Sequence, residues 1–300
     1  MKIKSPFNWV GNKYRYIDQI NNLLIGKSYS TVYDVFMGSG NIMLNIDCSA
    51  NLLIGNDYTP LMPNIYKHLS GAEGSFLFEE LNQIIDSWNR FSDKEDYYRF
   101  RDHWNNKYLA FNYDKEFIYE TILLLKMCSN SMVRFNYKKG YFNQGFRGIS
   151  EDKIANNNGE FFTERMKKSI IKELNSLKKA LQSRNFDFTV GDFRKVLCNV
   201  TENDLVILDP PYTLGSEMYG GSFTDKEDLY LLNFIEESDC DFILFNYLKK
   251  GDTYNLNLKK FLDSNPSLYV ESLNTKLSAG QNRLGRISIE EIMISNIKSN

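Results

Sequence analysis

The chain has 300 residues, of which 42% are hydrophobic and 25% are charged, and its formal net charge at pH 7 is −2. This composition is typical of a soluble globular protein, and the length allows one large domain or a domain with an insertion. No apolar run approaches the roughly 18 residues of a membrane-spanning helix. The first six residues lack the apolar core of a signal peptide, so we expect a cytoplasmic protein with no membrane partner.

Basic residues gather in three segments that contain no acidic residue, namely 1–17, 130–149 and 274–289. The near-neutral net charge does not indicate a non-specific nucleic-acid binder. Three such segments could nevertheless converge on a polyanion while the rest of the surface stays acidic. Chance clustering on solvated loops is the alternative for each of them.

The cysteines are far apart in the sequence and form no Cys-x-x-Cys pair. With only two histidines in the chain, they form no recognisable zinc pattern. We therefore expect reduced structural thiols and no metal site. The four positions are Cys48, Cys128, Cys198 and Cys240.

The first predicted elements form a strand, a turn, a helix and a second strand. Residues 31–36 are a β-branched and aromatic run, which predicts a strand, and residues 38–40 (Gly-Ser-Gly) predict a turn. We expect residues 41–50 to form the following helix and residues 52–56 to form the next strand. Such a unit is typical of the opening of a doubly wound sheet.

The next part of the chain has a helical pattern that interrupts the α/β alternation. Apolar residues recur at three- and four-residue spacing within 76–88, and 95–109 and 115–128 are further helical candidates. An irregular aromatic and basic stretch follows at 130–150. We therefore predict an inserted helical domain over 59–159, between the parts 1–58 and 160–300 of an α/β domain.

After the insert the α/β alternation resumes. An amphipathic helix is predicted over 166–181 and a shorter one over 225–237. The pattern as a whole predicts an α/β fold, with a doubly wound sheet and helices on both of its faces. Strands are expected at 186–190, 204–208, 241–245 and 289–295.

The motif Asp209-Pro210-Pro211-Tyr212 directly follows one of these strands. Open α/β sheets bind ligands at the carboxyl ends of their strands. The two prolines fix φ and remove two backbone donors, which leaves a stiff loop with free carbonyl oxygens. Such a loop can accept hydrogen bonds from an amino group and stack a ring on its plane. An ordinary strand-ending turn is the alternative, since Asp and Pro both favour turns.

The glycine turn and a following acid indicate a nucleoside-type ligand. Gly38 and Gly40 let the backbone approach a ligand closely. Asp57 ends the next strand, near the roughly 20-residue spacing at which an acid binds ribose hydroxyls. Met43 stands where the dinucleotide fingerprint has its third glycine, so a pyrophosphate is not indicated. Asp57 as a helix cap is the alternative.

Together these blocks resemble the DNA adenine methyltransferase (Dam) family, in that family's order. Residues 6–14 are similar to its N-terminal Trp-Ala-Gly-Gly-Lys segment, with Asn12 in place of a glycine. Residues 34–41 and 209–212 match its glycine loop and its Asp-Pro-Pro-Tyr loop, and 290–294 resemble its last strand. The resemblance implies a Rossmann-like methyltransferase sheet with an inserted helical target-recognition domain.

The resemblance also implies the reaction, which is methyl transfer from S-adenosylmethionine to the 6-amino group of adenine in duplex DNA, with S-adenosylhomocysteine as product. Asp209 and the Pro210 carbonyl would accept the amino hydrogens, and Tyr212 would stack on a base flipped out of the duplex. No cysteine nucleophile and no metal are required.

The residues that the resemblance assigns to the cofactor come from several blocks. Gly38 and Gly40 would approach it with their backbone, Asp57 would bind the ribose, and Trp9 and Lys13 would close the methionine end. Core packing is the alternative for Trp9 and Phe193. The full set is Trp9, Lys13, Phe36, Gly38, Gly40, Asp57, Phe193 and Asp209.

Residues 130–136 resemble the family's DNA-reading loop, with Asn130 and Arg134 at its polar positions. Arg134 is the best candidate for reading a base, since its fork suits guanine. Met132 is the candidate for the space that the flipped base leaves. The remaining DNA-binding candidates are Asn136, Lys138, Lys139, Arg147, Arg283 and Arg286, each of which could instead be a solvated surface residue.

Several alternatives stay open at this point. The target is offered as GATC, the commonest in the family, and a cognate restriction endonuclease is a conceivable second partner in a bacterial or phage-infected cytoplasm. An adenine methyltransferase acting on structured RNA shares the catalytic loop. A catalytically silent DNA-binding regulator is disfavoured by the intact Asp209, Tyr212 and Asp57. A glutamine methyltransferase usually begins the same loop with Asn.

Overall fold

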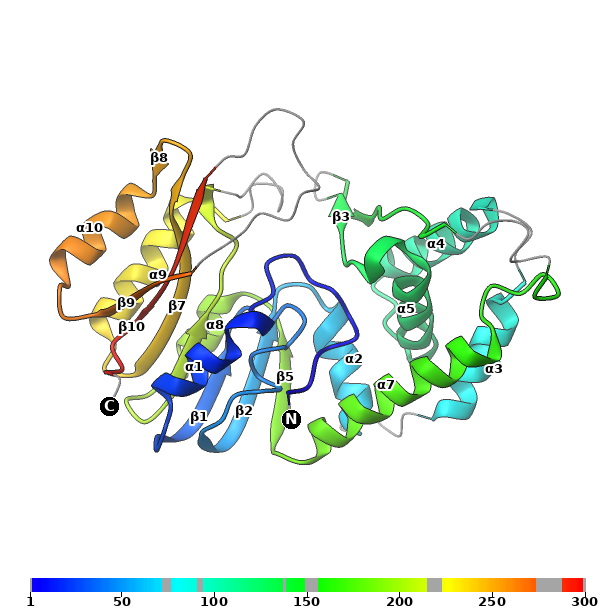
Figure 1. Cartoon of the computed structure of the whole chain (residues 1–300), viewed down its shortest axis with the longest axis horizontal. Coiled ribbons are helices and arrows are strands. Elements are labelled where there is room, and N and C mark those ends of the chain that lie inside the picture. The colour runs from blue at the N-terminus through cyan, green and yellow to red at the C-terminus, as the bar shows by residue number, and fades with distance from the viewer. Residues whose placement is uncertain are drawn as a thin grey trace. The chain divides into compact units, whose positions relative to one another are not determined.

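A computed structural model describes residues 2–71, 77–90, 94–136, 139–148, 156–214, 223–273 and 288–298. It confirms a mixed α/β protein whose central sheet is mostly parallel. The chain divides into two compact units. The first comprises Met1–Tyr14, Gly38–Asn45 and Thr59–Gly191, and the second comprises Arg15–Met37, Ile46–Tyr58 and Asp192–Asn300. Figure 1 labels the helices and strands.

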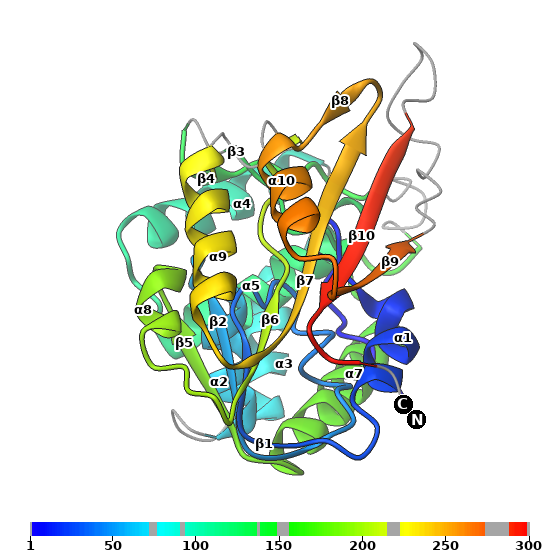
Figure 2. The ribbon, with the colours of Figure 1, turned by 90° about the vertical axis from the view of Figure 1, so that its left-hand side faces the viewer.

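The second unit contains a twisted sheet in which four neighbouring strands run parallel, and the next strand runs opposite to them and pairs antiparallel on both of its sides (Figure 2). The antiparallel strand β10 lies between β7 and β9, and β8 pairs with the end of β7. In the order of the sheet, the strands are β2 (Ser49–Asp57), β1 (Ser28–Asp34), β6 (Leu205–Leu208), β7 (Asp241–Lys250), β10 (Ile289–Ser295) and β9 (Tyr269–Leu273), with β8 (Thr253–Tyr254) beside β7.

β6 lies in the middle of this sheet, and its neighbours therefore exclude water from it. All four of its residues are buried, and it pairs in parallel with β1 on one side and β7 on the other. Apolar side chains of α8 (Phe193–Leu197), α9 (Asp225–Glu237) and α10 (Leu256–Ser264) pack with those of the strands in one core. In Figure 2, α1 (Ile17–Leu23) lies on the other side of the sheet from α9 and α10.

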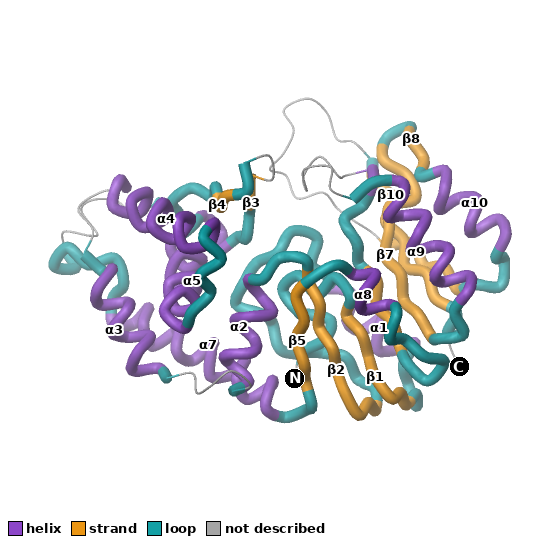
Figure 3. The backbone as a smooth tube through the Cα atoms, turned by 180° about the vertical axis from the view of Figure 1, so that it is seen from behind, coloured by secondary structure: helices purple, strands orange, loops and turns teal. Residues whose placement is uncertain are grey.

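The first unit is built mainly from helices (Figure 3). Its amphipathic helix α7 buries one apolar side and exposes a lysine-rich one. A short hairpin of two-residue strands follows α5 and the one-turn helix η2. The elements are α2 (Leu61–Ser70), α3 (Phe78–Trp88), α4 (Lys94–Leu109), α5 (Lys115–Met127), η2 (Ser129–Ser131), β3 (Phe135–Asn136), β4 (Tyr141–Phe142), α7 (Glu164–Gln182) and β5 (Phe186–Val190), with η1 (Tyr14–Tyr16) beginning at its border.

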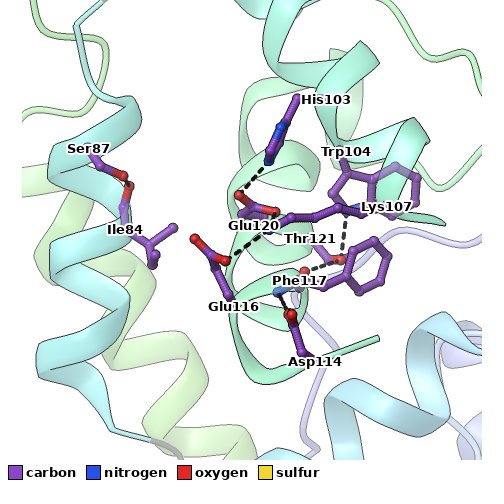
Figure 4. A network of polar contacts seen from close by, with 10 residues as sticks. All are labelled: Ile84, Ser87, His103, Trp104, Lys107, Asp114, Glu116, Phe117, Glu120 and Thr121. Atoms are coloured by element: carbon purple, nitrogen blue, oxygen red, sulfur yellow. Dashed lines mark hydrogen bonds and ion pairs between the residues drawn. The ribbon is translucent and has the colours of Figure 1, made fainter. Parts of the chain in front are cut away.

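An aromatic cluster holds α4, α5 and the hairpin together. The ring of Trp104 is fully buried and stacks on Phe117 with 5.0 Å between the ring centroids, and its indole nitrogen donates to Thr121 Oγ1 at 2.8 Å (Figure 4). Asn105 clamps the hairpin, because its side chain accepts from the backbone N–H of Phe142 and donates to the carbonyl of Phe142. The hairpin therefore has a fixed attachment to α4.

Glu120 is a buried carboxylate within the same helices, with only 1% of its side chain exposed. Lys107 donates to Glu120 Oε2 at 2.9 Å and to Glu116 Oε2 at 3.0 Å, and His103 Nε2 lies 3.0 Å from Glu120 Oε1 (Figure 4). Burial lowers the pKa of Lys107, but the hydrogen bonds to both carboxylates outweigh burial and raise it overall. Lys107 is therefore a charged partner that keeps Glu120 from being an unpaired buried charge.

The predicted helix over 41–50 is wrong. Residues 41–45 form turns, and β2 already begins at Ser49. Asn side chains compete with helical hydrogen bonds by binding nearby backbone groups. Asn45 donates to the carbonyl of Ile3 and accepts from its N–H, and Asn41 accepts from the N–H of Ser5. These contacts join the segment to the N-terminal residues and stop it from winding into a helix.

Most other predicted elements are confirmed, with shifts of up to three residues at their ends; β1 and β2 both begin three residues earlier than predicted. β5, α9 and β10 begin and end at the predicted residues. β7 continues five residues beyond its predicted end at residue 245. No separate element was predicted for α1, α2, α8, α10, β3, β4, β8 or β9. Among the described residues, no helix has both the length and the apolar character needed to cross a membrane.

Removal of the Lys107 cation should destabilise the helical unit strongly. We expect Lys107→Met to lower the free energy of unfolding by about 3 kcal/mol, since it leaves Glu120 with His103 but without its lysine. Glu116→Gln is the matched control, because the side chain of Glu116 is 55% exposed and its loss should cost at most about 1 kcal/mol. Urea unfolding followed by circular dichroism measures both, and equal losses would contradict this role of the buried carboxylate.

Candidate active site

The Asp209–Tyr212 loop begins where the central strand β6 ends. Because β1, β2 and β6 run parallel, their carboxyl ends lie at one edge of the sheet of the second unit. Phe36 follows β1 and Asp57 is the last residue of β2. The fold thus brings three predicted site segments to one edge, as the sequence pattern indicated.

Tyr212 joins the catalytic loop to the antiparallel strand β10. Its hydroxyl oxygen lies 2.9 Å from Asp209 Oδ1 and 2.8 Å from Glu291 Oε1. Tyr212 is 8% exposed and Glu291 is 4% exposed. Burial, followed by the charges of Asp209 and Glu291, raises the pKa of Tyr212 well above its ordinary value. The hydroxyl therefore keeps its proton at neutral pH and acts as a donor between two carboxylates.

The ring of Tyr247 packs against the ring of Tyr212. The centroids of the two rings are 4.2 Å apart and their planes meet at 57°. Burial, with Glu291 and Asp209 as further causes, raises the pKa of Tyr247 to about 12. Sequence analysis missed Tyr247 and Glu291 as site residues. A signal for Glu291 was present, since it is a charged residue inside the apolar run that forms β10.

The far end of the loop is also held by a side chain. Lys250, the last residue of β7, donates through Nζ to the carbonyl oxygen of Leu214 at 2.8 Å. Pro210 and Pro211 have no N–H with which the backbone could anchor itself. The loop is therefore fixed by contacts of Tyr212 and Leu214 with the neighbouring strands β10 and β7.

Phe36 and Phe193 lie together in the second unit. Their ring centroids are 5.3 Å apart, and Phe223, which sequence analysis did not single out, lies 6.0 Å from both. Phe193 is 8% exposed and belongs to the core, whereas Phe36 is half-buried. This cluster supports the packing interpretation of Phe193 and leaves its assignment to the cofactor a prediction.

Asp57 is buried at the end of β2, with 8% of its surface exposed. The N-cap residue of the following helix α2 is Pro60, so Asp57 is not its cap. The preceding residue, Asn56, accepts from the N–H of Met37 at 2.8 Å and donates to the carbonyl of Val35 at 3.1 Å. These bonds tie the ends of β1 and β2 together just before the glycine turn.

The glycine turn belongs to the first unit, where it packs against the N-terminal segment. Gly38 and Gly40 have φ angles of 47° and 67°, in the left-handed region that favours glycine. A Cβ on Gly38 would lie 3.0 Å from Cδ1 of Trp9. Lys13 is 3% exposed and donates to the carbonyl of Gly11 at 2.7 Å. Trp9 is half-buried.

Tyr66 on α2 holds this turn in place through hydrogen bonds of its hydroxyl group. Its hydroxyl lies 2.6 Å from the carbonyl oxygen of Ser39 and 2.9 Å from Oγ of Ser5. Asn41 donates to Oγ of Ser39 at 2.8 Å and accepts from the N–H of Ser5 at 2.9 Å. Sequence analysis missed Tyr66 because its partners are distant in the sequence, and it missed Asn41 because that residue lies in the segment predicted to be helical.

The predicted DNA-reading loop is hydrogen-bonded to the N-terminal segment. Asn8 donates to the carbonyls of Asn130 and Ser131 and accepts from the N–H of Val133. Asn130 has a φ of 60° and is exposed, and Met132 is half-buried beside Asn8. One continuous stretch, residues 8–9, therefore contacts both this loop and the glycine turn.

The other DNA-binding candidates of the first unit differ in how free their side chains are. Arg134 and Lys139 are exposed, whereas Asn136 accepts from the N–H of Lys139 within the hairpin turn. Arg147 is exposed, yet it donates to the carbonyl of Lys126 at 3.1 Å. Lys138, Arg283 and Arg286 lie outside the described residues.

The predicted site residues thus fall into two sets. The first unit holds Trp9, Lys13, Gly38, Gly40, Asn130, Met132, Arg134, Asn136, Lys139 and Arg147. The second unit holds Phe36, Asp57, Phe193, Asp209, Pro210 and Tyr212.

Comparison with known families agrees with this geometry. The family model described as D12 class N6 adenine-specific DNA methyltransferase matches residues 9–271, a range that includes the N-terminal segment from Trp9 onwards, the glycine turn and the catalytic loop. The chain belongs to this family. The predicted resemblance to adenine-specific DNA methyltransferases is confirmed, and the family implies a methyl donor of the S-adenosylmethionine type.

Three curated relatives show the same relationship. Modification methylase StsI from Streptococcus sanguinis is 27% identical over 99% of this chain and 43% of its own length. Type II methyltransferase M.FokI from Planomicrobium okeanokoites is 22% identical over 98% of this chain and 43% of its own length. Type II methyltransferase M1.LlaDCHI from Lactococcus lactis subsp. cremoris is 23% identical over 78% of this chain and 75% of its own length. The chain thus spans less than half the length of the first two relatives.

Solved structures match more weakly. Precorrin 8W decarboxylase from Methanobacterium thermoautotrophicum aligns over 98% of both chains at 10% identity, with a TM-score of 0.38. The rRNA methyltransferase aviRa from Streptomyces viridochromogenes aligns over 95% of this chain and 84% of its own at 11% identity, with a TM-score of 0.35. No conclusion rests on either likeness.

A side chain at Gly38 should disturb the N-terminal segment and with it cofactor binding. Gly38→Ala places a Cβ 3.0 Å from the Trp9 ring at a φ of 47°, so we expect the affinity for S-adenosylmethionine to fall at least about tenfold. Isothermal titration calorimetry measures this.

Gly71→Ala is the matched control. Gly71 in the same unit also has a positive φ, of 92°, but a Cβ there would meet nothing within 4 Å beyond its chain neighbours. The variant should lose stability to backbone strain while its affinity for the cofactor stays unchanged. A Gly38→Ala protein that binds S-adenosylmethionine as well as this control does would contradict the role of the turn.

Proposed function

We propose that this chain transfers a methyl group from S-adenosylmethionine to the 6-amino group of adenine in duplex DNA. One observation supports this most strongly: the Asp-Pro-Pro-Tyr loop begins at the carboxyl end of the central strand β6, in a member of the adenine-specific family. The hydrogen bonds of Tyr212 and Lys250 fix the loop there. A preformed loop is what positional and electrostatic catalysis requires.

We assign the catalytic role to groups that can accept the hydrogens of the amino group. The lone pair of adenine's amino nitrogen is delocalised into the ring, which makes the nitrogen a poor nucleophile. The Asp209 carboxylate and the Pro210 carbonyl would each accept one amino hydrogen, which draws the nitrogen towards a tetrahedral geometry and localises its lone pair. Asp209 then stabilises the positive charge that develops on the nitrogen in the transition state.

The target base has to leave the duplex before these groups can reach it. Flipping costs a few kcal/mol, which stacking and pocket hydrogen bonds partly recover. Tyr212 is the residue we assign to stacking, with Tyr247 behind it. Met132 on the DNA-reading loop is our candidate for filling the space that the base leaves.

The cofactor that we propose is a nucleoside with a charged tail. Glycine at position 38 leaves room for the Trp9 ring beside the turn, and both glycines have the positive φ that a side chain would strain. We assign the ribose hydroxyls to Asp57, the methionine end to Trp9 and Lys13, and the adenine ring to Phe36 and Phe193. When bound, S-adenosylmethionine supplies the electrophilic methyl group.

For sequence recognition we assign base reading to Arg134 and propose GATC as the target. Lys138, Lys139, Arg147, Arg283 and Arg286 are proposed phosphate contacts, which position the DNA without specifying its sequence. Asn130 and Asn136 are the other polar candidates on the loop. A cognate restriction endonuclease is proposed as a second partner because two of the relatives are named as type II methyltransferases. We place the protein in the cytoplasm.

Loss of the Asp209 carboxylate tests the chemistry directly. We expect Asp209→Ala to lower the rate of methyl transfer to DNA at least about 10³-fold, since it removes the main acceptor for the amino group. Asp263→Ala, at an exposed acid on α10, should keep the full rate. The assay counts labelled methyl groups transferred from S-adenosylmethionine to duplex DNA, with thermal unfolding as a check of the fold. Normal activity of the Asp209→Ala protein would overturn the proposal.

Base reading by Arg134 predicts a change of specificity. We expect Arg134→Ala to reduce the preference for the cognate site over a site with one substituted base pair by about 1–3 kcal/mol. Lys139→Ala, an exposed neighbour in the same hairpin, should weaken binding to both duplexes equally and lower the salt dependence. Fluorescence anisotropy at several salt concentrations measures both. Unchanged discrimination in Arg134→Ala would remove this residue from the reading set.

Two alternatives are separated by the choice of substrate. An RNA adenine methyltransferase would methylate structured RNA faster than duplex DNA. A silent regulator would bind DNA but not S-adenosylmethionine.

A further inference from the structure

A second carboxylate lies beside the catalytic loop and has no part in the reaction as described. Glu291 is on β10, 4% exposed, and its Oε1 is 2.8 Å from the Tyr212 hydroxyl oxygen. Asp209 Oδ1 is 2.9 Å from that same oxygen. One hydroxyl group therefore lies within hydrogen-bond distance of two carboxylates, and the two come from different parts of the sheet.

Packing alone gives no reason for a carboxylate at this position. The residues that follow Glu291 in β10 are Ile292, Met293 and Ile294, all of them buried. Burial of a charge is costly, and a carboxylate near Asp209 also repels it. A neutral residue of similar size would fill the same place in the sheet without either cost. The acidic side chain is therefore explained better by what it does to the Tyr212 hydroxyl.

The effect of Glu291 on the Tyr212 hydroxyl follows from the number of protons that this hydroxyl carries. A tyrosine hydroxyl has one proton to donate, so at any moment it can donate to Asp209 or to Glu291 but not to both. A bond from Tyr212 to Asp209 would occupy one of the lone pairs with which Asp209 accepts the amino hydrogens of the base. Glu291 provides the alternative acceptor.

We propose that Glu291 is a positioning residue that accepts the hydrogen bond of the Tyr212 hydroxyl and so keeps the Asp209 carboxylate available to the target amino group. The inference rests on the proposed methylation of adenine and deepens it. Glu291 acts through Tyr212 and not on the base itself. The same bond anchors a loop whose two prolines offer no backbone donors.

A double-mutant cycle between Glu291 and Tyr212 tests this role. Glu291→Ala should lower kcat for adenine methylation roughly 10- to 100-fold, the range expected for loss of a hydrogen bond to a charged group. KM for DNA and for S-adenosylmethionine should change little. Glu291→Gln, whose amide oxygen can still accept the bond, should restore kcat to within about threefold of the unsubstituted chain.

Tyr212→Phe removes the hydroxyl and keeps the ring. If Glu291 acts through that hydroxyl, adding Glu291→Ala to Tyr212→Phe should lower kcat no further. Glu290→Ala is the matched control, since Glu290 is exposed on the same strand, and it should leave kcat unchanged. Thermal unfolding of each variant shows whether it is folded. If Glu291→Ala does not fold, the kcat of Glu291→Gln tests the role of Glu291 instead.

The outcomes separate this inference from the proposed function. Equal losses of kcat for Glu291→Ala with and without the Tyr212 hydroxyl would overturn the inference and leave adenine methylation intact. An unchanged kcat in Glu291→Ala, or a loss in Glu291→Gln as large as that in Glu291→Ala, would also overturn it. If the unsubstituted chain methylates no adenine, the proposed function fails and the inference fails with it.

Discussion

The hydrogen bonds of the Tyr212 side chain are the contacts on which the catalytic loop depends most. Pro210 and Pro211 stiffen the loop but deprive it of two backbone donors, so anchoring has to come from side chains. Tyr212 reaches Asp209 within the loop and Glu291 on β10, and Lys250 holds the carbonyl of Leu214. Side-chain contacts with the neighbouring strands therefore fix the position of a loop whose two prolines donate no backbone hydrogen bonds.

Side chains play the same part in the first unit. Asn8 bridges to the predicted DNA-reading loop, and the adjacent Trp9 packs on Gly38 in the glycine turn. Tyr66 and Asn41 fasten that turn to Ser39 and Ser5. In both units, short backbone segments without regular structure present the candidate functional groups. In both, buried polar contacts from neighbouring elements fix those segments.

Local patterns predicted the regular elements well and the long-range contacts poorly. The apolar run of β6 and the period of α7 are properties of neighbouring residues, so their positions could be read from the sequence. The helix over 41–50 failed because Asn41 and Asn45 bind the backbone of residues near the N-terminus, which no local pattern reveals. The charge of Glu291 within the apolar run of β10 was a local signal, but its role could not be read from it, since its partner Tyr212 lies 79 residues away. The catalytic loop was found because its chemistry is contained in four consecutive residues.

The reaction that we propose for this chain is methylation of the 6-amino group of adenine in DNA. The most direct measurement is incubation with S-adenosylmethionine carrying a labelled methyl group and unmethylated duplexes with and without GATC, followed by digestion to nucleosides and mass spectrometry. We expect label in N6-methyladenine from the duplex that contains GATC. Label in adenine of both duplexes would keep the chemistry and discard the target. Label in cytosine, or in RNA in preference to either duplex, would contradict the account.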